Sequence, residues 1–480
     1  MTYDPPPGSI PTLGVPSLDG LQRIHLVGVG GAGMRGIAHL LLARGFEVSG
    51  SDLKESRGLE ELRAQGARIF VGHAASQLGA EGDPDAVVVS SAIPQRNPEL
   101  AEARERGLPV WARAQVLAAL MAGSRTIAVA GTHGKTTTTS MLCVILERAG
   151  LDPTYVIGGD LNESGSGAKQ GAGEWFVAET DESDGSFLLL APEIGVVTNV
   201  EEDHLDFYRD GDEIRAAFAS FVNRCGSVIA CADDAGAREV LAAAPATASQ
   251  TYGIGEDAIA RLRVLDADRP VARAELVLDD GVAEIELRIP GTHNLLNAAG
   301  AILAARATGV DPRRAAEALR SFSGVRRRFE YRGVVRGAEL FDDYAHHPTE
   351  VAATLEAADG HRRILAVFQP HRYSRTRALG RALGESLAGA HVVVVTDVYG
   401  AGEEPIPGIT GKVVVDGLAE SAPSKRVLYL PRRSDVVQYL LEEIRAGDLV
   451  LSLGAGDITT LADELIDRAR SPIEGAKGRV

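Results

Sequence analysis

Apolar and polar residues follow one another along the chain in blocks with the periods of strands and helices. From Arg23 the order is strand (RIHLVGV), glycine-rich turn (GGAG), helix (MRGIAHLLLARG) and strand (FEVSGSD), which indicates a βαβ unit. A second strand and turn, TIAVAGTHGKTTT, leads into the helical run SMLCVILERAG, and WFVAET and IGVVTNV are unbroken apolar runs typical of strands buried on both faces. The last third alternates the strands RRILAVFQ, HVVVVTDV, RVLYL and DLVLSLGA with helical segments. The pattern predicts an α/β protein with mostly parallel sheets.

Other segments carry a different pattern. The first 22 residues are rich in proline and predict a disordered tail. DAVVVSSAI predicts a strand that runs to Pro94, and WARAQVLAALMAG predicts a helix that leads into the next domain. Residues 264–289 alternate apolar and polar side chains and predict antiparallel hairpins at a sheet edge. The run SGVRRRFEYRG has four arginines and few apolar residues, which is typical of a linker.

These breaks and the chain length place the domain boundaries. The chain has 480 residues, and domains of roughly 150 residues suggest about three of them. We predict a tail at 1–22 and domains at 23–122, 123–324 and 325–480.

Composition narrows the classes of partner and compartment. The chain carries 49 Lys and Arg against 66 Asp and Glu, a net charge of -17, which argues against binding to nucleic acid or anionic lipid. Its three cysteines form no CxxC pair, so we expect neither a disulfide framework nor a structural zinc site. No apolar run reaches the ~18 residues of a membrane span, and the N-terminal segment does not read as a secretory signal. We therefore expect a cytoplasmic protein without membrane insertion.

The strongest chemical signal is the sequence GTHGKTT between a predicted strand and helix. Backbone N–H groups of such a turn converge on phosphate oxygens, a lysine neutralises charge between the β- and γ-phosphates, and a hydroxyl reaches magnesium. The full P-loop pattern needs a glycine where this chain has Val129, and the alternative is a glycine-rich turn with a surface lysine. The predicted nucleotide-binding residues are Gly131, Thr132, His133, Gly134, Lys135, Thr136 and Thr137.

A second glycine-rich turn matches the dinucleotide fingerprint. Gly28, Gly30 and Gly33 have the required spacing, Gly31 lies between them, and Asp52 follows at the end of the next strand. Alone, this motif suggests NAD. The same geometry serves any nucleotide diphosphate, and tight packing of helix and strand without a ligand is the alternative.

Acidic residues and a histidine follow the next two strands. Glu179 closes one predicted strand, and His204 follows the other. The carboxyl ends of such strands carry the ligand site of open α/β sheets, so we predict that Glu179, His204 and Thr136 bind magnesium beside the nucleotide. We expect a solvated acidic loop to include some of Asp181, Glu182 and Asp184.

Polar motifs in the rest of the chain have two readings each. GTHN at 291–294 precedes a helix and is either an N-cap or part of a site, and RRRFE at 326–330 is either a solvated linker or a source of guanidinium groups for a γ-phosphate. Arg372 and Arg375 are candidates for a phosphate or carboxylate clamp. Adjacent His346 and His347 point to opposite faces of an extended segment, so we expect no zinc pair there.

With these motifs in order, the chain resembles the Mur ligases over nearly all of residues 23 to 470. The matching motifs are GVGGAGM, SGSD, SSAI, GTHGKTTT, ETDESDGSF, TNVEEDHLD, GTHNLLNAAGA, RRRFE, DDYAHHP, FQPHRYSRT and DVYGAGE. The resemblance implies an N-terminal Rossmann-like domain, a central P-loop ATPase and a C-terminal Rossmann-like domain. It also implies an ATP- and magnesium-dependent ligase that joins UDP-N-acetylmuramate to L-alanine through an acyl phosphate, in peptidoglycan synthesis and hence in cell-wall growth, cell shape and division.

The resemblance implies a role for each matching residue. Lys135 and Thr136 would contact phosphate and a first magnesium, and Glu179 and His204 a second. Asn294 would contact adenine, Arg328 the γ-phosphate and Asp343 the ribose. The remaining set is expected to bind the other substrates: His347, Arg372 and Arg375 the amino acid, and Gly28, Gly30, Gly31, Gly33, Asp52, Ser90 and Ser91 the sugar nucleotide.

Some alternatives stay open at this point. The group that deprotonates the amine could be His346, His347 or solvent, and the chain could be a monomer or a homodimer. A relative that attaches a ready-made tripeptide would share every phosphate motif. An NAD-dependent oxidoreductase would explain only residues 23 to 52, and a nucleotide-gated regulator without chemistry would leave the acid and histidine ligands without a role. We expect no carbamylated lysine.

Overall fold

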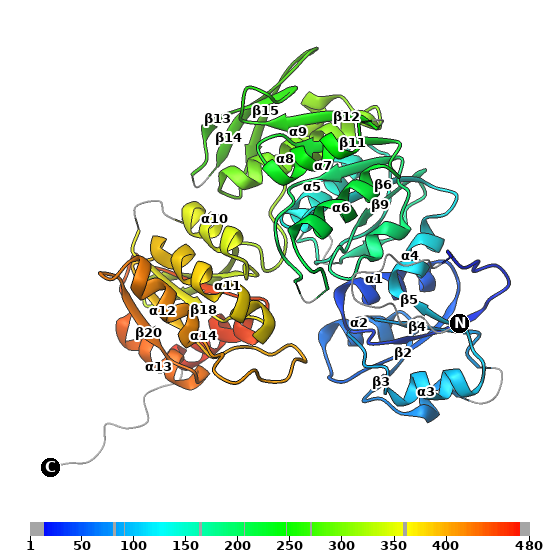
Figure 1. Cartoon of the computed structure of the whole chain (residues 1–480), viewed down its shortest axis with the longest axis horizontal. Coiled ribbons are helices and arrows are strands. Elements are labelled where there is room, and N and C mark those ends of the chain that lie inside the picture. Colours follow the sequence, from blue (N-terminus) through cyan, green and yellow to red (C-terminus); the bar gives the residue numbers. More distant parts are fainter. Residues whose placement is uncertain are drawn as a thin grey trace. The chain divides into compact units, whose positions relative to one another are not determined.

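The computed structural model describes residues 14–79, 83–90, 92–162, 166–205, 207–245, 247–268, 271–358 and 362–470. These residues form three β-sheets flanked by helices (Figure 1). The chain divides into two compact units. The larger comprises most of the chain up to Leu265 with Arg273–Leu287 and Asn294–Ser323, and the smaller comprises Gly324 onward with Asp266–Ala272 and Arg288–His293. The predicted α/β class is confirmed.

The first sheet is parallel and has the order β3-β2-β1-β4-β5. Strand order reverses between β1 and β4, and such a reversal marks the ligand-binding edge of an open α/β sheet. The predicted strand to Pro94 ends at Val89, where Ser90 begins the turn. The elements are β1 (Arg23–Val27), α1 (Ala32–Ala43), β2 (Glu47–Asp52), α2 (Arg57–Ala64), β3 (Arg68–Val71), η1 (Ala75–Leu78), β4 (Ala86–Val89), α3 (Pro98–Glu105), β5 (Val110–Ala112) and α4 (Arg113–Met121).

The second sheet has ten strands in the order β15-β14-β13-β12-β11-β10-β6-β9-β7-β8. Its central strand β6 pairs in parallel with β9 and β10. The alternating segment predicted as edge hairpins forms β13 to β15 at one edge, although β13 also pairs in parallel with β12. The elements are β6 (Arg125–Ala130), α5 (Lys135–Arg148), β7 (Thr154–Val156), β8 (Ala168–Lys169), β9 (Trp175–Glu179), η2 (Ser186–Leu189), β10 (Ile194–Val197), α6 (Gly211–Val222), β11 (Ser227–Cys231), α7 (Ala235–Ala243), β12 (Ala248–Gly253), β13 (Ala260–Asp266), β14 (Ala272–Leu278), β15 (Gly281–Leu287), α8 (Thr292–Ala307) and α9 (Pro312–Leu319).

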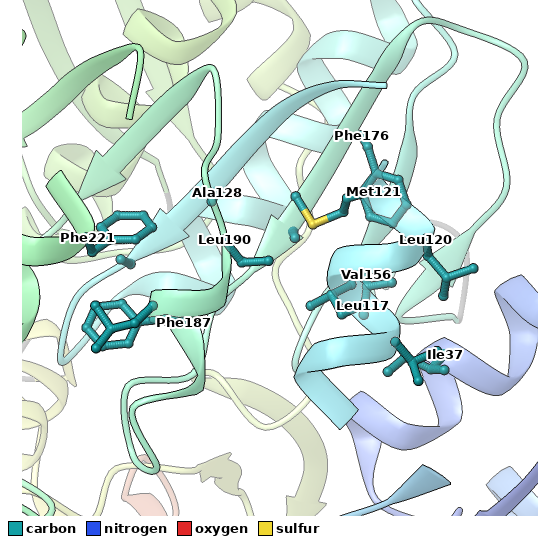
Figure 2. Packing of buried hydrophobic residues seen from close by; sticks show 14 of the residues in the cluster. Ile37, Leu117, Leu120, Met121, Ala128, Val156, Phe176, Phe187, Leu190 and Phe221 are labelled. Carbon is teal, nitrogen blue, oxygen red and sulfur yellow. The ribbon is translucent and has the colours of Figure 1, made fainter. Parts of the chain in front are cut away.

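One hydrophobic cluster connects the first two sheets. It runs from Ile37 on α1 and Leu117 on α4 to Val156 on β7, and continues to Phe187 and Phe221 (Figure 2). The ring centroids of Phe187 and Phe221 are 5.4 Å apart. Because apolar burial is the main stabilising term in folding, this cluster holds the two sheets in one unit.

The third sheet, in the smaller unit, has the order β16-β17-β21-β18-β19-β20. Helices α10 to α12 pack on one face, and α13 and α14 pack on the other. The run predicted as a linker instead contains the start of strand β16, which is half exposed and therefore needs few apolar residues. The elements are β16 (Glu330–Val335), β17 (Ala338–Asp343), α10 (Pro348–Ala358), β18 (Ile364–Phe368), α11 (Tyr373–Ser386), η3 (Leu387–Gly389), β19 (Val392–Val395), α12 (Lys412–Ser421), β20 (Arg426–Tyr429), α13 (Arg433–Glu443), β21 (Leu449–Leu453), η4 (Asp457–Thr460) and α14 (Leu461–Arg470).

Among the helices that the structure describes, none has the length and apolar character needed to cross a membrane.

Candidate active site

The loop between β6 and α5 is shaped by two glycines. Gly131 has φ +138° and Gly134, which precedes the first residue of α5, has φ +79°. Side chains other than hydrogen are strained at such angles. A Cβ at Gly131 would also overlap Thr198 Oγ1, and one at Gly134 would lie 2.5 Å from Asn297 Oδ1. The loop therefore takes a form that only glycine permits at these two positions.

Neighbouring backbone holds the middle of this loop. The N–H of Thr132 donates to the carbonyl of Asn199 (3.0 Å), and that of His133 donates to Asn199 Oδ1 (2.8 Å). Thr132 Oγ1 accepts from the N–H of Glu201 (2.9 Å). Asn199 and Glu201 follow β10, so the strand beside β6 fixes the loop at the carboxyl edge of the sheet. Asn199 lies in the matching motif TNVEEDHLD, but its sequence position alone predicted no role for it.

Lys135 begins α5 and folds back over the loop. Its Nζ donates to the carbonyls of Gly131 (2.5 Å) and Thr132 (3.1 Å) and to Glu182 Oε1 (2.7 Å). Burial lowers the pKa of Lys135, but the carboxylates of Glu182, Glu179 and Asp181 together outweigh this effect, so the pKa lies above the ordinary value for lysine. The Lys135 amine is therefore positively charged and held in one position over the loop between β6 and α5.

Acidic groups surround the start of α5. Thr136 Oγ1 donates to Glu179 Oε1 (2.8 Å), and the N–H of Gly158 donates to Glu179 Oε2 (2.6 Å). His204 has φ +53°, and its Nε2 lies 3.6 Å from Glu182 Oε1. Glu182 Oε2 is buried and receives no hydrogen bond from the residues that the structure describes. The structure thus brings the predicted Lys135, Thr136, Glu179 and His204 to the same edge of the sheet.

Glu182 belongs to the acidic segment for which we expect partial solvation, and the sequence pattern predicts no role for it. The structure buries it, because only 3% of its surface is exposed. The carbonyl of Glu182 also accepts from Tyr208 Oη (2.6 Å). Its position in the sequence could have indicated a role in the site. Glu182 follows β9 by three residues, at the strand end next to the glycine-rich loop between β6 and α5.

Arg113 links this edge to the first domain. Its Nη2 donates to Asp181 Oδ2 (2.7 Å), and a Cβ at Gly33 would lie 2.8 Å from its Nη1. Burial raises the pKa of Asp181, but Arg113, Ser183 and Lys135 together outweigh this effect, and the pKa is lowered to about 2. Arg113 therefore lies between the first turn of α1 and the acidic segment beside Lys135.

The fingerprint loop between β1 and α1 is held by the end of β2. The carbonyl of Ser51 accepts from the N–H groups of Gly28 (2.8 Å) and Val29 (3.0 Å), and Asp52 Oδ2 accepts from that of Gly30 (2.9 Å). Asp52 thus bonds to the loop itself. Gly31 precedes α1 as its N-cap, Ser90 lies beside Gly28, and the predicted Ser91 lies outside the described residues.

Helix α8 packs its first turns beside α5. Thr138 Oγ1 donates to Asn297 Oδ1 (3.2 Å), and the predicted Asn294 is buried one turn earlier on α8. Thr137 is buried on α5. Helix α8 thus begins within GTHN and lies beside the loop through Asn297, one turn after the motif.

The other predicted residues belong to the smaller unit. Arg328 Nη1 lies 3.5 Å from Glu350 Oε1, and its guanidinium lies over the ring of Tyr344, 5.2 Å from the centroid. Asp343 Oδ2 accepts from the N–H of Phe329 (2.7 Å) and is buried at the end of β17. His347 is also buried. The arginine-rich segment 326–330 and the end of β17 therefore form one polar cluster.

The segment FQPHRYSRT after β18 places two arginines at the start of α11. Arg372 is the N-cap, with φ +68°, and Arg375 Nη1 lies 3.3 Å from His371 Nδ1. The His371 ring stacks on Tyr399, with centroids 5.8 Å apart. Burial, together with His346 and the arginines, lowers the pKa of His371 to about 3, which makes it a poor base near neutral pH.

We expect Asp343 to make stability depend on pH. Burial raises its pKa to about 6, although Arg328 and backbone N–H groups oppose this effect, whereas an aspartate in an unfolded chain has a pKa of about 3.9. Between these values the folded chain retains a proton that the unfolded chain has released, so the free energy of unfolding falls as pH rises through this window. Relative to Asp343→Asn, the wild type should lose about 2 kcal/mol of unfolding free energy between pH 4 and 6, and the difference should level off about one pH unit above that. Denaturant titrations of both proteins from pH 4 to 8 measure this difference, and a constant difference would contradict the prediction.

The fold and the site together define an α/β protein with a glycine-rich loop between a central strand and a helix, over which a lysine is fixed. Models of three Mur ligase domains match the chain: the Mur ligase family catalytic domain at residues 23–125, the Mur ligase middle domain at 129–305 and the Mur ligase glutamate ligase domain at 327–456. The chain belongs to the Mur ligase family, and the resemblance seen in its motifs is confirmed.

Relatives and solved structures match nearly the whole chain. A UDP-N-acetylmuramate--L-alanine ligase from Kineococcus radiotolerans is 50% identical over 455 residues, 93% of this chain and 96% of that protein. The enzyme of the same name from Pelotomaculum thermopropionicum is 46% identical over 460 residues, 94% and 99% of the two chains. Among solved structures, a UDP-N-acetylmuramate-alanine ligase from Thermotoga maritima has a TM-score of 0.79 and 29% identity over 93% and 98% of the two chains. A murein peptide ligase from Psychrobacter arcticus has a TM-score of 0.72 and 26% identity over 96% and 100%.

Proposed function

We propose that this protein is an ATP-dependent ligase that joins UDP-N-acetylmuramate to L-alanine and releases ADP and phosphate. The observation that carries the proposal is the identity of 46 to 50% to ligases of that name over nearly the full length of both chains. The product would enter peptidoglycan synthesis, and thus cell-wall growth and division. Because the reaction consumes ATP and a nucleotide-linked sugar, we propose that the protein acts in the cytoplasm. We propose that it is a monomer or a homodimer and that its partners are small-molecule substrates.

The geometry of the phosphate loop supports the chemistry. A carboxylate of the sugar nucleotide must attack the γ-phosphorus of ATP, so two anions must approach each other. The amine of L-alanine then attacks the resulting acyl phosphate, forming the amide and expelling phosphate. Lys135 is positively charged and held over the loop by three oxygens, so its charge needs no reorganisation when the anions meet.

Magnesium fits the acidic groups around Lys135. Hard oxygen donors are the ligands that this ion prefers, and the buried Glu182 Oε2 is a carboxylate oxygen that receives no hydrogen bond from the described residues. We propose that Thr136, Glu179 and His204 hold magnesium, with Glu182 as an added candidate. When bound, the ion would neutralise phosphate charge. Lys135 supplies the same kind of stabilisation from the protein itself.

The remaining roles follow the motif positions and stay proposals. In the larger unit, Gly131 to Thr137 and Asn294 would bind ATP, and the fingerprint loop with Asp52, Ser90 and Ser91 would bind the sugar nucleotide. In the smaller unit, Arg328 and Asp343 would bind ATP, and His347, Arg372 and Arg375 the amino acid. The domain boundaries at 122 and 324 are likewise proposed.

The test is phosphate release with ATP, magnesium and UDP-N-acetylmuramate, with L-alanine and the tripeptide L-alanyl-γ-D-glutamyl-meso-diaminopimelate compared as acceptors. We expect turnover with L-alanine and formation of UDP-N-acetylmuramoyl-L-alanine. Turnover with the tripeptide alone would instead assign the chain to the murein peptide ligases, which the Psychrobacter arcticus structure represents. Family membership does not favour the alternative of an NAD-dependent oxidoreductase. Binding of NADH to the protein would be needed to support that alternative.

A further inference from the structure

The face of the first sheet that packs against α3 contains a buried group of polar side chains beside an apolar cluster. Alternate residues of a strand share a face, so His25 and Val27 on β1 point to the same side. That side has a small apolar cluster, in which Val27 packs with Leu100 of α3. Beside this cluster lies a set of ionisable and hydroxyl side chains with little or no exposed surface: His25, Ser49, Ser51, His73 and Glu99.

Glu99 is the centre of this network. His25 Nε2 lies 2.7 Å from Glu99 Oε2, and His73 Nδ1 lies 2.7 Å from Oε1. Ser51 Oγ lies 2.9 and 2.8 Å from the two oxygens, which share its single proton. Burial raises the pKa of Glu99, but the hydrogen bonds from His25, Ser51 and His73 outweigh this effect and the pKa lies below its ordinary value. An ionised carboxylate only accepts, so all three partners must donate to it.

The network is anchored at both ends. His25 Nδ1 lies 2.8 Å from Ser49 Oγ, its neighbour on β2. The N–H of Glu99 donates to Asn97 Oδ1 (2.9 Å), which caps α3. The carboxylate position is therefore fixed by a helix end on one side and by two strands on the other.

Through Ser51 this network reaches the fingerprint loop. The carbonyl of Ser51 accepts from Gly28 and Val29, and the adjacent Asp52 accepts from Gly30. Three successive N–H groups of the loop thus depend on a dipeptide whose serine side chain is tied to Glu99. A buried, fully bonded polar network of this kind imposes one arrangement, whereas apolar packing would tolerate several.

We propose that Glu99, supported by His25, is a positioning residue for sugar-nucleotide binding. It acts through Ser51, whose carbonyl sets the backbone of the loop at Gly28 to Gly30. The effect on substrate binding rests on the proposed function. The effect on the loop backbone does not, and the two are therefore measured separately.

Glu99→Gln tests the network, because one amide oxygen cannot accept from three donors. Ser51→Ala is the second variant, since it removes only the hydroxyl link and keeps the backbone carbonyl. We expect both to accelerate amide hydrogen exchange in the peptide that covers Val27 to Gly31 of the chain without substrates. With substrates, the KM for UDP-N-acetylmuramate should rise roughly tenfold to a hundredfold, while the KM for ATP stays within about twofold of the wild type.

The matched control is Leu100→Ala. It weakens the same helix through lost apolar packing next to Glu99, without touching the hydrogen bonds of the network. It should lower thermal stability but leave loop exchange and the KM for the sugar nucleotide near wild-type values. The proposal is overturned if Leu100→Ala raises that KM as much as Glu99→Gln does, or if both network variants exchange at the wild-type rate. If Glu99→Gln does not fold, the exchange rate and KM of Ser51→Ala test the proposal. If the wild type shows no turnover, the proposed function is wrong, but amide exchange in the loop still tests the positioning role.

Discussion

Lys135→Ala is expected to reduce phosphate release by roughly a thousandfold or more, because it removes the fixed charge over the phosphate loop. The same change leaves Glu182 buried without its cation, which should cost about 3 to 5 kcal/mol of stability. Loss of turnover could then reflect a failure to fold. The double variant Lys135→Ala/Glu182→Gln removes both charges and should recover much of the stability without recovering turnover.

Lys169→Ala is the matched control for this experiment. Lys169 is also paired with two carboxylates, Glu147 at 2.8 Å and Asp152 at 2.9 Å, but it is 40% exposed. Exposed ion pairs contribute about 0 to 1 kcal/mol, so stability and turnover should remain close to wild type. The role of Lys135 is wrong if its alanine variant turns over within tenfold of the wild type, measured by phosphate release and denaturant unfolding together.

Gly131→Ala should reduce turnover by at least roughly a hundredfold, because an added Cβ would overlap Thr198 Oγ1 and displace the loop. Displacement would move the carbonyl that Lys135 Nζ contacts at 2.5 Å. Phosphate release and thermal unfolding measure the effects on chemistry and on folding.

Gly123→Ala separates steric overlap from backbone strain. Gly123 also has positive φ, +82°, but nothing lies within 4 Å of a Cβ built there. It should cost about 1 kcal/mol of stability and leave turnover unchanged. Equal losses of turnover in the two variants would show that the overlap with Thr198 is not what matters at Gly131.

Much of the fold follows from local pattern. The βαβ unit from Arg23 and the strands buried on both faces are visible as apolar runs because both faces of a parallel sheet are covered. Strand β16 was not visible, since an exposed edge strand tolerates the arginines of RRRFEYRG. The end of β4 at Val89 also escaped detection, because Ala92 and Ile93 continue the apolar pattern into a turn.

Part of the candidate site could be predicted from the sequence, where residues of suitable chemistry occur at the spacing of a known motif. The glycines and lysine of GTHGKT stand between a strand and a helix, and this combination has few other uses. Glu182 was missed because a charge run reads as solvated, and only the fold shows that this acid turns inward to Lys135. The role of His25 could not be predicted either. A single histidine inside an apolar strand gives no local indication that a glutamate from α3 hydrogen-bonds to it in the folded chain.

The hydrophobic cluster that joins the first two sheets also limits how the chain can be recombined. Ile37 and Leu117 precede residue 122, and Val156 follows it, yet all three belong to the same buried cluster (Figure 2). A chimaera that exchanged the first hundred or so residues with those of another ligase would break this packing unless the side chains on both sides were exchanged together. The first two sheets would therefore have to be exchanged together to keep this packing intact.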